Sequence, residues 1–399
     1  MAEKIVITGL GAVTPVGIGV KNYWENILVG QCGIAEIDRP DADTLLVKRA
    51  AQVLDFDPAA CLTSRLRADL DRFMQLAFIS AEEALADSGL QPAGSRVGIV
   101  MGTALAGMAL AGETQAQFVA GKKVGPRFTS QYMGNIAAAQ LSIKYGIQGP
   151  SMTVGTACSS GGDAVYLAKL LLDSGAADAM IVMAGESAVS PLLINSLVKA
   201  GALSKTGSSL PFDANRDGFV IGEGGGALIL ETESYAKARG AKIHAELIAC
   251  GNNTDAYNVV SPDPAGTGAA DCMRLALAAA GLQPEDIGYV NAHGTATKTG
   301  DIAETSALKS VFGDYAVPVS STKGATGHMM GAGGITELIA CICAIESGKL
   351  PPNTGLTTQD ENCALNLVKP GQTADLRYAM SNALGFGGQN SSVIVGKYA

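Results

Sequence analysis

The sequence has few of the residues and patterns on which several common kinds of site depend. Among 399 residues there are three histidines and one tryptophan, and 16% of the residues are charged, against about 25% in an average globular domain. No segment has the GxxxxGK[ST] pattern of a phosphate-binding loop or the GxSxG pattern of a serine hydrolase. The cysteines lack the paired spacing of zinc ligands. Nucleotide hydrolases with a P-loop, serine hydrolases of that type and zinc domains are therefore disfavoured.

Charge and hydropathy argue against two further classes of partner. The formal net charge of −9 disfavours nucleic acid as a partner. No uninterrupted apolar run is long enough to span a bilayer, and the first residues lack the apolar core and cleavage site of a signal peptide. The eight scattered cysteines are interpreted as reduced thiols. We therefore expect a cytoplasmic protein with no metal site, no membrane and no nucleic-acid partner.

A loose internal repeat indicates two similar halves. The tetrapeptide Gly-Leu-Gln-Pro ends a helix-like run at residues 89–92 and again at 281–284, and a strand-like run follows each copy. Gly followed by Pro is typical of the end of a helix. The repeated order of strand, loop and helix predicts an α/β fold with two similar halves, residues 1–240 and 241–399. If a pseudo-twofold axis relates the halves, their equivalent loops converge on one cleft.

Cys158 lies in Val-Gly-Thr-Ala-Cys-Ser-Ser-Gly-Gly, residues 154–162, at the junction of an apolar run and a helix-like run. We expect Ser151–Val154 to be the end of a buried strand and Asp163–Ser174 to be a helix. A thiol at the N-terminus of a helix faces unpaired backbone N–H groups and the positive end of the helix dipole, which favour thiolate. From this segment alone, Cys158 is either a nucleophile or a small buried apolar residue.

Two of the three histidines lie in segments rich in Gly and Thr. His293 and His328 each follow a strand-like run, Ile287–Asn291 and Val317–Ser320, and sites in α/β folds are built just beyond the carboxyl ends of strands. His244 fits a structural role on an amphipathic element. A thiol, two histidines and Lys323 suit acyl transfer through a thioester.

Two further segments are predicted from their turn residues. The polar stretch Ser204–Gly218 predicts a surface loop before a strand at Gly226–Glu231. Tyr378–Ala383 and Ser392–Val395 predict a pair of strands around a loop in which the ring of Phe386 stands between glycines. That loop either presents backbone N–H groups to a substrate or is an ordinary hairpin turn.

Four segments in order resemble the β-ketoacyl-acyl-carrier-protein synthases, and most of all the type II elongating enzymes. They are Thr-Ala-Cys-Ser-Ser at 156–160, Asn-Ala-His-Gly-Thr-Ala-Thr at 291–297, Ser-Thr-Lys-Gly-Ala-Thr-Gly-His at 321–328, and Asn-Ala-Leu-Gly-Phe-Gly-Gly-Gln-Asn at 382–390. The resemblance implies the duplicated thiolase-like fold, with five layers α-β-α-β-α. It also implies a dimer in which a strand near Ser151–Gly155 pairs across the interface. The acyl substrates are carried on the phosphopantetheine arm of an acyl carrier protein, and no other cofactor is expected.

The resemblance also implies a role for each matching residue. Cys158 would take the acyl chain, and His293 and His328 would hold the malonyl thioester and promote loss of CO2. Backbone N–H groups of Cys158 and Phe386 would form an oxyanion hole. The remaining implied roles are as follows: Lys323, placed among Glu337 and Asp301, would orient the histidines; Thr295 and Thr297 would bind the phosphopantetheine arm; Phe386, Leu384, Leu197 and Leu105 would form the acyl gate and pocket.

The sequence departs from the family at the acyl pocket and at the rim where the carrier protein docks. The elongating enzymes usually have Phe at the position of Leu384 and an aromatic residue at that of Leu197, so the pocket here is expected to be wider or differently shaped. An Arg often found in the family is replaced by Gly201. A carrier protein is acidic, so a local basic patch is required. The candidate docking residues are Arg65, Arg67, Arg72, Lys122, Lys123 and Arg127.

Three functions are compatible with the resemblance. The first is a condensing enzyme of fatty-acid elongation, and the second is the same chemistry in a dedicated polyketide or polyene pathway. The third is a silent partner subunit that sets chain length, which is disfavoured because such partners lack the active cysteine. A thiolase is disfavoured because Ser381–Asn390 has no cysteine. The sequence leaves open whether the chain forms a homodimer or a heterodimer with a chain-length factor.

Overall fold

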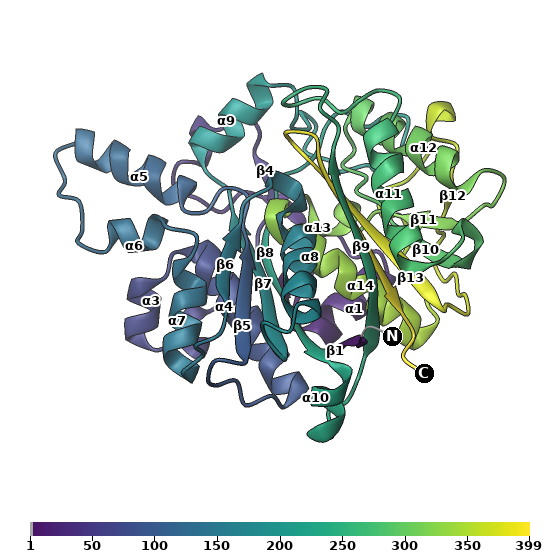
Figure 1. The fold of residues 1–399 in the computed structure, drawn as a ribbon. Helices are drawn as coiled ribbons and strands as arrows, with labels where there is room; N and C mark the ends of the chain where they lie inside the picture. Colours follow the sequence, from purple (N-terminus) through teal and green to yellow (C-terminus); the bar gives the residue numbers. More distant parts are fainter. Residues whose placement is uncertain (1–2) are drawn as a thin grey trace.

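The computed structural model describes residues 3–399 (Figure 1). Its main sheet consists of two sets of strands that are joined edge to edge, and each set is called a sheet below. The first set is ordered β6-β5-β7-β8-β1 and the second β11-β10-β13-β14-β9, and β1 pairs with β9. The strands of the first set are β1 (Ile5–Thr14), β5 (Val97–Gly102), β6 (Ser151–Val154), β7 (Ala179–Ser187) and β8 (Glu223–Thr232). Those of the second set are β9 (Ala245–Thr254), β10 (Ile287–Asn291), β11 (Pro318–Ser320), β13 (Tyr378–Gly385) and β14 (Gln389–Gly396), with β12 (Asn366–Leu367) beyond β11.

The two sets repeat the same topology. In each five-strand order the second strand runs parallel to its two neighbours: β5 is parallel to β6 and β7, as β10 is to β11 and β13. β7, β8 and β1 then alternate in direction, as do β13, β14 and β9. The helices before β5 and β10 end at Gly89 and Gly281 with φ of 64° and 65°, a left-handed conformation that Gly adopts without strain. The duplication indicated by the Gly-Leu-Gln-Pro repeat is therefore present in the fold.

Helices divide the molecule into five layers. α4 (Arg72–Ser88) and α7 (Ile136–Tyr145) cover the outer face of the first sheet, and α11 (Thr267–Ala280) and α12 (Lys298–Phe312) cover the outer face of the second (Figure 1). α8 (Ser160–Asp173) and α14 (Gly333–Ser347) pack against each other between the sheets. This confirms the expected α-β-α-β-α arrangement. The segment Met330–Ser347 is long and apolar enough to cross a membrane, but 89% of it is buried inside the fold, as befits a central helix.

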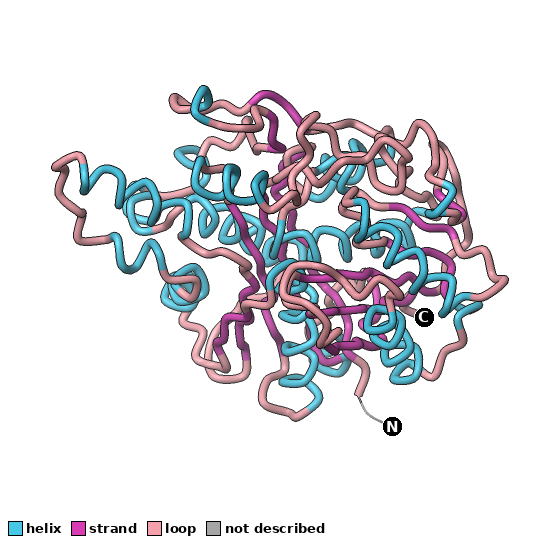
Figure 2. Tube along the Cα trace, turned by 90° about the horizontal axis from the view of Figure 1, so that it is seen from above, coloured by secondary structure: helices cyan, strands magenta, loops and turns pink. Residues whose placement is uncertain are grey.

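The remaining elements are short or peripheral. α5 and α6 project from the body as an arm, which Figures 1 and 2 both show. The other helices are α1 (Val20–Leu28), α2 (Pro58–Cys61), α3 (Ser64–Asp69), α5 (Met108–Val119), α6 (Phe128–Tyr132), α9 (Pro191–Lys199), α10 (Glu233–Ala238) and α13 (Lys323–Thr326). The other strands are β2 (Gly17–Ile18), β3 (Ile34–Glu36) and β4 (Arg49–Ala51).

Two predictions about local environment were wrong. Ser151–Val154 is a strand, but it is the exposed edge of the sheet rather than a buried strand. The stretch Ser204–Gly218 is not a simple surface loop, because Phe212, Asp213 and Arg216 are buried. Asp213 accepts hydrogen bonds from Thr357 and Thr358, and these contacts draw the polar loop into the fold. Composition gives the polarity of a segment, but the tertiary partners that satisfy its polar groups decide whether the segment is buried.

Candidate active site

The nucleophile candidate Cys158 stands on a sharp turn between the two sheets. The turn is a 3-10 helix at Ala157–Ser159 that leads into α8, and Ala157 has a φ of 51°, which is uncommon for a residue with a side chain. The β13–β14 hairpin approaches so closely that a Cβ on Gly385 would lie 3.3 Å from the Cys158 nitrogen. The turn therefore places the thiol, 8% exposed, where the two halves meet.

Asp163 holds this turn from the first turn of α8. Its carboxylate accepts hydrogen bonds from the hydroxyls of Thr156 (2.6 Å) and Ser159 (3.0 Å) and from the amide of Asn252 on β9 (2.8 Å). The first two contacts brace both sides of Cys158, and the third ties the turn to the second sheet. Asp163 was not among the residues predicted from the sequence, where its only signal was an acid in the first turn of the predicted helix.

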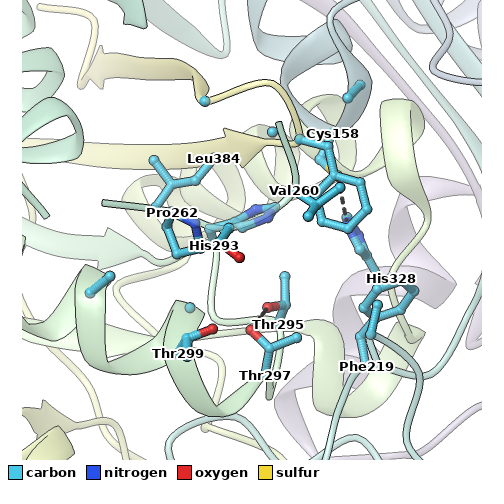
Figure 3. A pocket seen from close by; sticks show the side chains of 18 of the residues that line it. Cys158, Phe219, Val260, Pro262, His293, Thr295, Thr297, Thr299, His328 and Leu384 are labelled. Atoms are coloured by element: carbon cyan, nitrogen blue, oxygen red, sulfur yellow. Dashed lines mark hydrogen bonds between the residues drawn. The ribbon is translucent and has the colours of Figure 1, made fainter. Parts of the chain in front are cut away.

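The structure brings Cys158, His293 and His328 together (Figure 3). The ligating atoms of the three side chains lie within 4.8 Å of one another, and His328 Nε2 lies 3.0 Å from Cys158 Sγ. The two imidazole rings pack edge to face, with centroids 5.3 Å apart. His293 follows β10, and His328 follows α13, so both come from the second half. The prediction that equivalent loops of the two halves converge on one cleft is therefore confirmed.

Burial decides the protonation of this group. It lowers the pKa of His293 and of His328 well below the usual value, and the positive charge of Lys323 lowers both further. Burial raises the pKa of the Cys158 thiol to about 11, against the backbone N–H of Phe386 and the charge of Lys323, which act in the opposite direction. The groups that favour the thiolate, as expected at this turn, are therefore outweighed by burial. Desolvation outweighs the backbone N–H of Phe386 and the charge of Lys323, so it favours a thiol beside two neutral imidazoles.

Lys323 and Glu337 form a buried ion pair behind the histidines. Burial raises the pKa of Glu337, and the adjacent Lys323 opposes that shift. Asp301, expected beside Lys323, pairs instead with Arg216 at 3.6 Å and accepts hydrogen bonds from the backbone N–H groups of Phe212 and Ala296. Burial raises the pKa of Asp301, and the charge of Lys323 also acts on Asp301 and opposes that shift. Asp301 anchors the backbone of the segment that carries His293.

Glu304 was missed by the sequence analysis. Its carboxylate accepts hydrogen bonds from the backbone N–H groups of His293 and Gly294, both at 2.7 Å. Burial raises the pKa of Glu304 to about 7. The available signal was the spacing of Asp301 and Glu304, three residues apart at the start of a helix, which places both acids on one face. Together they fix the loop between β10 and α12.

The second ring nitrogens of the histidines differ from expectation. An imidazole that donates from one nitrogen is usually held by a partner on the other, but Nδ1 of His293 and Nδ1 of His328 are buried and have no hydrogen-bond partner within residues 3–399. Packing orients the rings instead, with Phe219 edge-on to His328 at a centroid distance of 5.2 Å.

A cavity of about 290 Å³ opens onto the three side chains. One side is apolar and includes Leu105, Leu193, Leu197 and Met330. The other side carries hydroxyls, and Thr295 and Thr297 lie there with their oxygens 3.0 Å apart (Figure 3). Leu384 also lines the cavity, as does Phe386, which is 39% exposed at the tip of the β13–β14 hairpin. The predicted gate, pocket and arm-binding residues thus share one cavity.

The candidate docking residues differ in their exposure and in their ion pairs. Arg65, Arg67, Lys122, Lys123 and Arg127 are exposed, although Asp69 pairs with Arg127 at 2.8 Å and with Arg65 at 3.7 Å. Arg72 is corrected: its guanidinium donates to the buried carboxylate of Glu223 and to the carbonyl of Val53. It is a structural ion pair rather than a free docking charge.

The Cys158, His293 and His328 trio also has the spacing of a metal site. The buried ammonium of Lys323 lowers the pKa of both imidazoles, and the same field disfavours a cation between them. The raised pKa of Cys158 further disfavours the thiolate that a metal requires. We therefore keep the prediction of a site that works without metal.

Comparison with known proteins places the chain in a family. The model of the β-ketoacyl synthase N-terminal domain matches residues 2–236, and that of the C-terminal domain matches residues 244–357. The chain is 38% identical over 409 residues to 3-oxoacyl-[acyl-carrier-protein] synthase 2 of Coxiella burnetii and 37% identical over 408 residues to that of Staphylococcus aureus, with 99% of each chain covered.

Solved structures agree with this assignment. The ishigamide ketosynthase/chain length factor superposes with a TM-score of 0.95 at 30% identity, and a β-ketoacyl synthase from Burkholderia phymatum with a TM-score of 0.92 at 31%. A type II polyketide ketosynthase bound to a hexaketide, in complex with its acyl-carrier protein, gives a TM-score of 0.90 at 30%. Each comparison covers all of both chains. The chain therefore belongs to the β-ketoacyl synthase family, whose members are acyltransferases that form carbon–carbon bonds.

Proposed function

We propose that the protein condenses an acyl group with a malonyl group carried on acyl carrier protein, giving 3-oxoacyl-carrier protein and CO2. The observation that carries this proposal is the meeting of Cys158, His293 and His328 at a cavity with one apolar wall and one wall bearing hydroxyls. The apolar wall suits an acyl chain, and the hydroxyls suit the amides of a phosphopantetheine arm.

In the first step the Cys158 sulfur attacks the carbonyl of the acyl thioester. Because the thiol is protonated at rest, its proton passes to Nε2 of His328, 3.0 Å away, as the C–S bond forms. The negative oxygen of the tetrahedral intermediate accepts hydrogen bonds from the backbone N–H groups of Cys158 and Phe386. The bond to the carrier sulfur then breaks, and that sulfur takes the proton from His328. The products are acyl-Cys158 and a free carrier thiol.

In the second step a malonyl thioester occupies the place of the released carrier. Neutral His293 donates its ring N–H group to its carbonyl oxygen, and His328 donates from Nε2 once its ring proton has moved from Nδ1 to Nε2 by exchange with solvent. The bond to the carboxylate breaks, CO2 leaves, and the electron pair forms an enolate that those two donors stabilise. The enolate carbon attacks the acyl-Cys158 carbonyl, the C–S bond breaks, and the sulfur takes up one proton from solvent.

Lys323 serves this chemistry through its charge. It lowers the pKa of both imidazoles, which keeps them as neutral donors, and it lowers that of Cys158, which eases loss of the thiol proton. Glu337 fixes the ammonium in place. Residues 1–240 would thus supply the nucleophile, and residues 241–399 the proton-handling groups.

The carrier protein is the proposed partner. Thr295 and Thr297 would hold its phosphopantetheine arm, and the exposed cations at Arg65, Arg67, Lys122, Lys123 and Arg127 would face its acidic surface. The exposed edge of β6 supports a dimer in which this strand pairs with a second chain, because an open strand edge is a template for pairing. We propose a homodimer in the cytoplasm.

Fatty-acid elongation is the pathway we propose, since the curated relatives at 37–38% identity are 3-oxoacyl-[acyl-carrier-protein] synthases. One observation favours a type II polyketide or polyene pathway instead. Leu197 and Leu384 both line the cavity where the elongating enzymes usually carry rings, so the cavity suits a chain of unusual shape.

Condensation assays separate these readings. Purified protein is supplied with malonyl-carrier protein and a series of saturated and polyunsaturated acyl-carrier proteins, and CO2 and 3-oxoacyl product are measured. Similar rates for ordinary saturated chains, with no gain for polyunsaturated ones, would support fatty-acid elongation. A strong preference for polyunsaturated chains would support the second pathway. Absence of product with every acyl carrier, from a folded protein, would contradict the proposed reaction.

A further inference from the structure

Glu186 is a fully buried acid at the end of β7 that the mechanism above does not use. Its carboxylate accepts four hydrogen bonds, and every donor is neutral. Burial raises its pKa to about 7, and the backbone N–H groups that it accepts act in the opposite direction because they favour the carboxylate. A buried acid in such surroundings costs stability, so its contacts indicate what it supports.

The carboxylate joins two loops that are far apart in the sequence. From the loop after β5 it accepts the backbone N–H of Ala104 at 2.7 Å, the N–H of Leu105 at 3.2 Å and the hydroxyl of Thr103 at 3.3 Å. From the 3-10 helix Met330–Ala332 it accepts the N–H of Gly331 at 3.3 Å. A Cβ on Gly331 would lie 2.7 Å from the Ala104 nitrogen, so the two loops touch at this point.

Both loops hold a residue in an unfavourable backbone conformation. Ala106 has a φ of 46° and Met330 a φ of 45°, and residues with side chains adopt such values only where their surroundings enforce them. Thr103 extends the network to the first of them, because its hydroxyl accepts the backbone N–H of Ala106 at 3.1 Å. Gly331, held by Glu186, directly follows the second.

The same two loops supply part of the wall beside Cys158. Ala104, Leu105 and Met330 line the cavity, and they pack with Cys158 in one apolar cluster. The positions of these side chains are therefore fixed by backbone N–H groups that converge on one carboxylate.

We propose that Glu186 is a positioning residue that locks the two loops of the acyl wall and so sets which acyl chains reach Cys158. The inference rests on the proposed condensing function and adds a determinant of acyl specificity to it. An amide in place of the carboxylate would present an NH2 group to backbone donors, which leaves at least one buried donor unpaired. The two loops would then separate or shift, and the apolar wall would move with them.

The test compares Glu186→Gln with a matched control, Glu231→Gln. Glu231 is also fully buried, on the neighbouring β8, but its carboxylate binds Arg239 and Thr8, away from the cavity. For each protein, KM and kcat for acylation of Cys158 are measured across acyl-carrier proteins of increasing chain length. CO2 release from malonyl-carrier protein is measured in parallel.

For Glu186→Gln we expect kcat/KM for the longest accepted chains to fall about tenfold or more, because a displaced wall misplaces the acyl carbonyl. The shortest chains and CO2 release should change far less, so the profile against chain length changes shape. Glu231→Gln should lose stability but keep the wild-type profile. Glu186→Asp keeps the charge but is too short to reach both loops, and it should give an intermediate profile. Thr103→Val, which removes one donor, should shift the profile in the same direction if Glu186→Gln does not fold.

An unchanged profile in the Glu186 variants, or an equal loss at every chain length, would overturn the inference. The same profile shift in Glu231→Gln would also overturn it, because the effect would then be general destabilisation. If wild-type protein fails to become acylated at all, the proposed function fails instead, and the two failures are thereby distinguished.

Discussion

Removal of the buried ammonium of Lys323 should separate the stability of the site from its chemistry. Lys323 is 1% and Glu337 2% exposed, so Lys323→Met leaves a carboxylate buried without its partner. Breaking such a pair costs about 3–5 kcal/mol. Glu337 already has a raised pKa and will take up a proton once Lys323 is gone, which limits the loss. We expect the free energy of unfolding to fall by about 3 kcal/mol at pH 7.

The double variant Lys323→Met with Glu337→Gln provides the control. It leaves no unpaired charge, so most of the lost stability should return, because replacement of a whole buried pair is much less costly than loss of one partner. Activity should not return. Without the ammonium, the pKa of His293 and of His328 rises and that of the Cys158 thiol rises further.

Urea unfolding is measured for wild type, both single variants and the double variant, which together form a double-mutant cycle. CO2 release from malonyl-carrier protein is measured as a function of pH. In Lys323→Met the acid limb of the rate profile should move to higher pH, because the imidazoles become protonated more easily. A single variant within about 1 kcal/mol of wild type, or a double variant that regains both stability and activity, would refute the electrostatic role of Lys323.

Three further outcomes are expected. His244 bridges Asp87 and Glu346, and these carboxylates outweigh burial and raise its pKa from 6.5 to about 9, so the stabilisation from this ion pair is fully present below pH 6.5 and is lost as pH rises through about 9. Urea unfolding across that range should show the free energy of unfolding fall by up to about 3 kcal/mol, and by less than this limit because both carboxylates are about one-third exposed. His244→Asn should show no such dependence on pH. If wild type shows no such loss, the ion pair is unimportant. Leu197→Phe should add a ring to the cavity and reduce kcat/KM for long acyl chains about tenfold relative to short ones; equal rates at all lengths would remove Leu197 from the acyl wall. The double variant Lys122→Glu with Lys123→Glu should raise KM for carrier-bound substrate at low salt, whereas Lys349→Glu, at an exposed position remote in sequence, should not. Equal effects of the two changes on KM would argue against docking near residue 122.

The sequence was sufficient for the fold and for the central side chains because both depend on local patterns. The Gly-Leu-Gln-Pro repeat marks equivalent helix ends, and equivalent elements in a duplicated fold converge on one cleft. The segments around Cys158, His293 and His328 are each short and continuous, so their residues stay together whatever the rest of the chain does.

The sequence was insufficient where the answer depends on which distant groups share a buried space. The motifs place Asp301 near Lys323, but they do not show that its ion-pair partner is Arg216, which comes from a loop expected at the surface. Glu186 and Glu304 carry no motif, and their roles follow only from the backbone N–H groups that face them. The pKa of Cys158 depends on the fold in the same way: the position of a helix is visible in the sequence, whereas the depth of burial that raises the pKa of the thiol is a property of the whole fold.

The most direct test of the proposed mechanism is to locate the acyl group on the protein before condensation. Wild-type protein, Cys158→Ala and His328→Ala are each mixed with one labelled acyl-carrier protein in the absence of malonyl substrate, digested and mapped by mass spectrometry. We expect label on the peptide that carries Cys158 in wild type, none in Cys158→Ala, and slower labelling in His328→Ala because the thiol loses its proton acceptor. Label on another residue, or equal labelling of Cys158→Ala, would contradict the proposed mechanism.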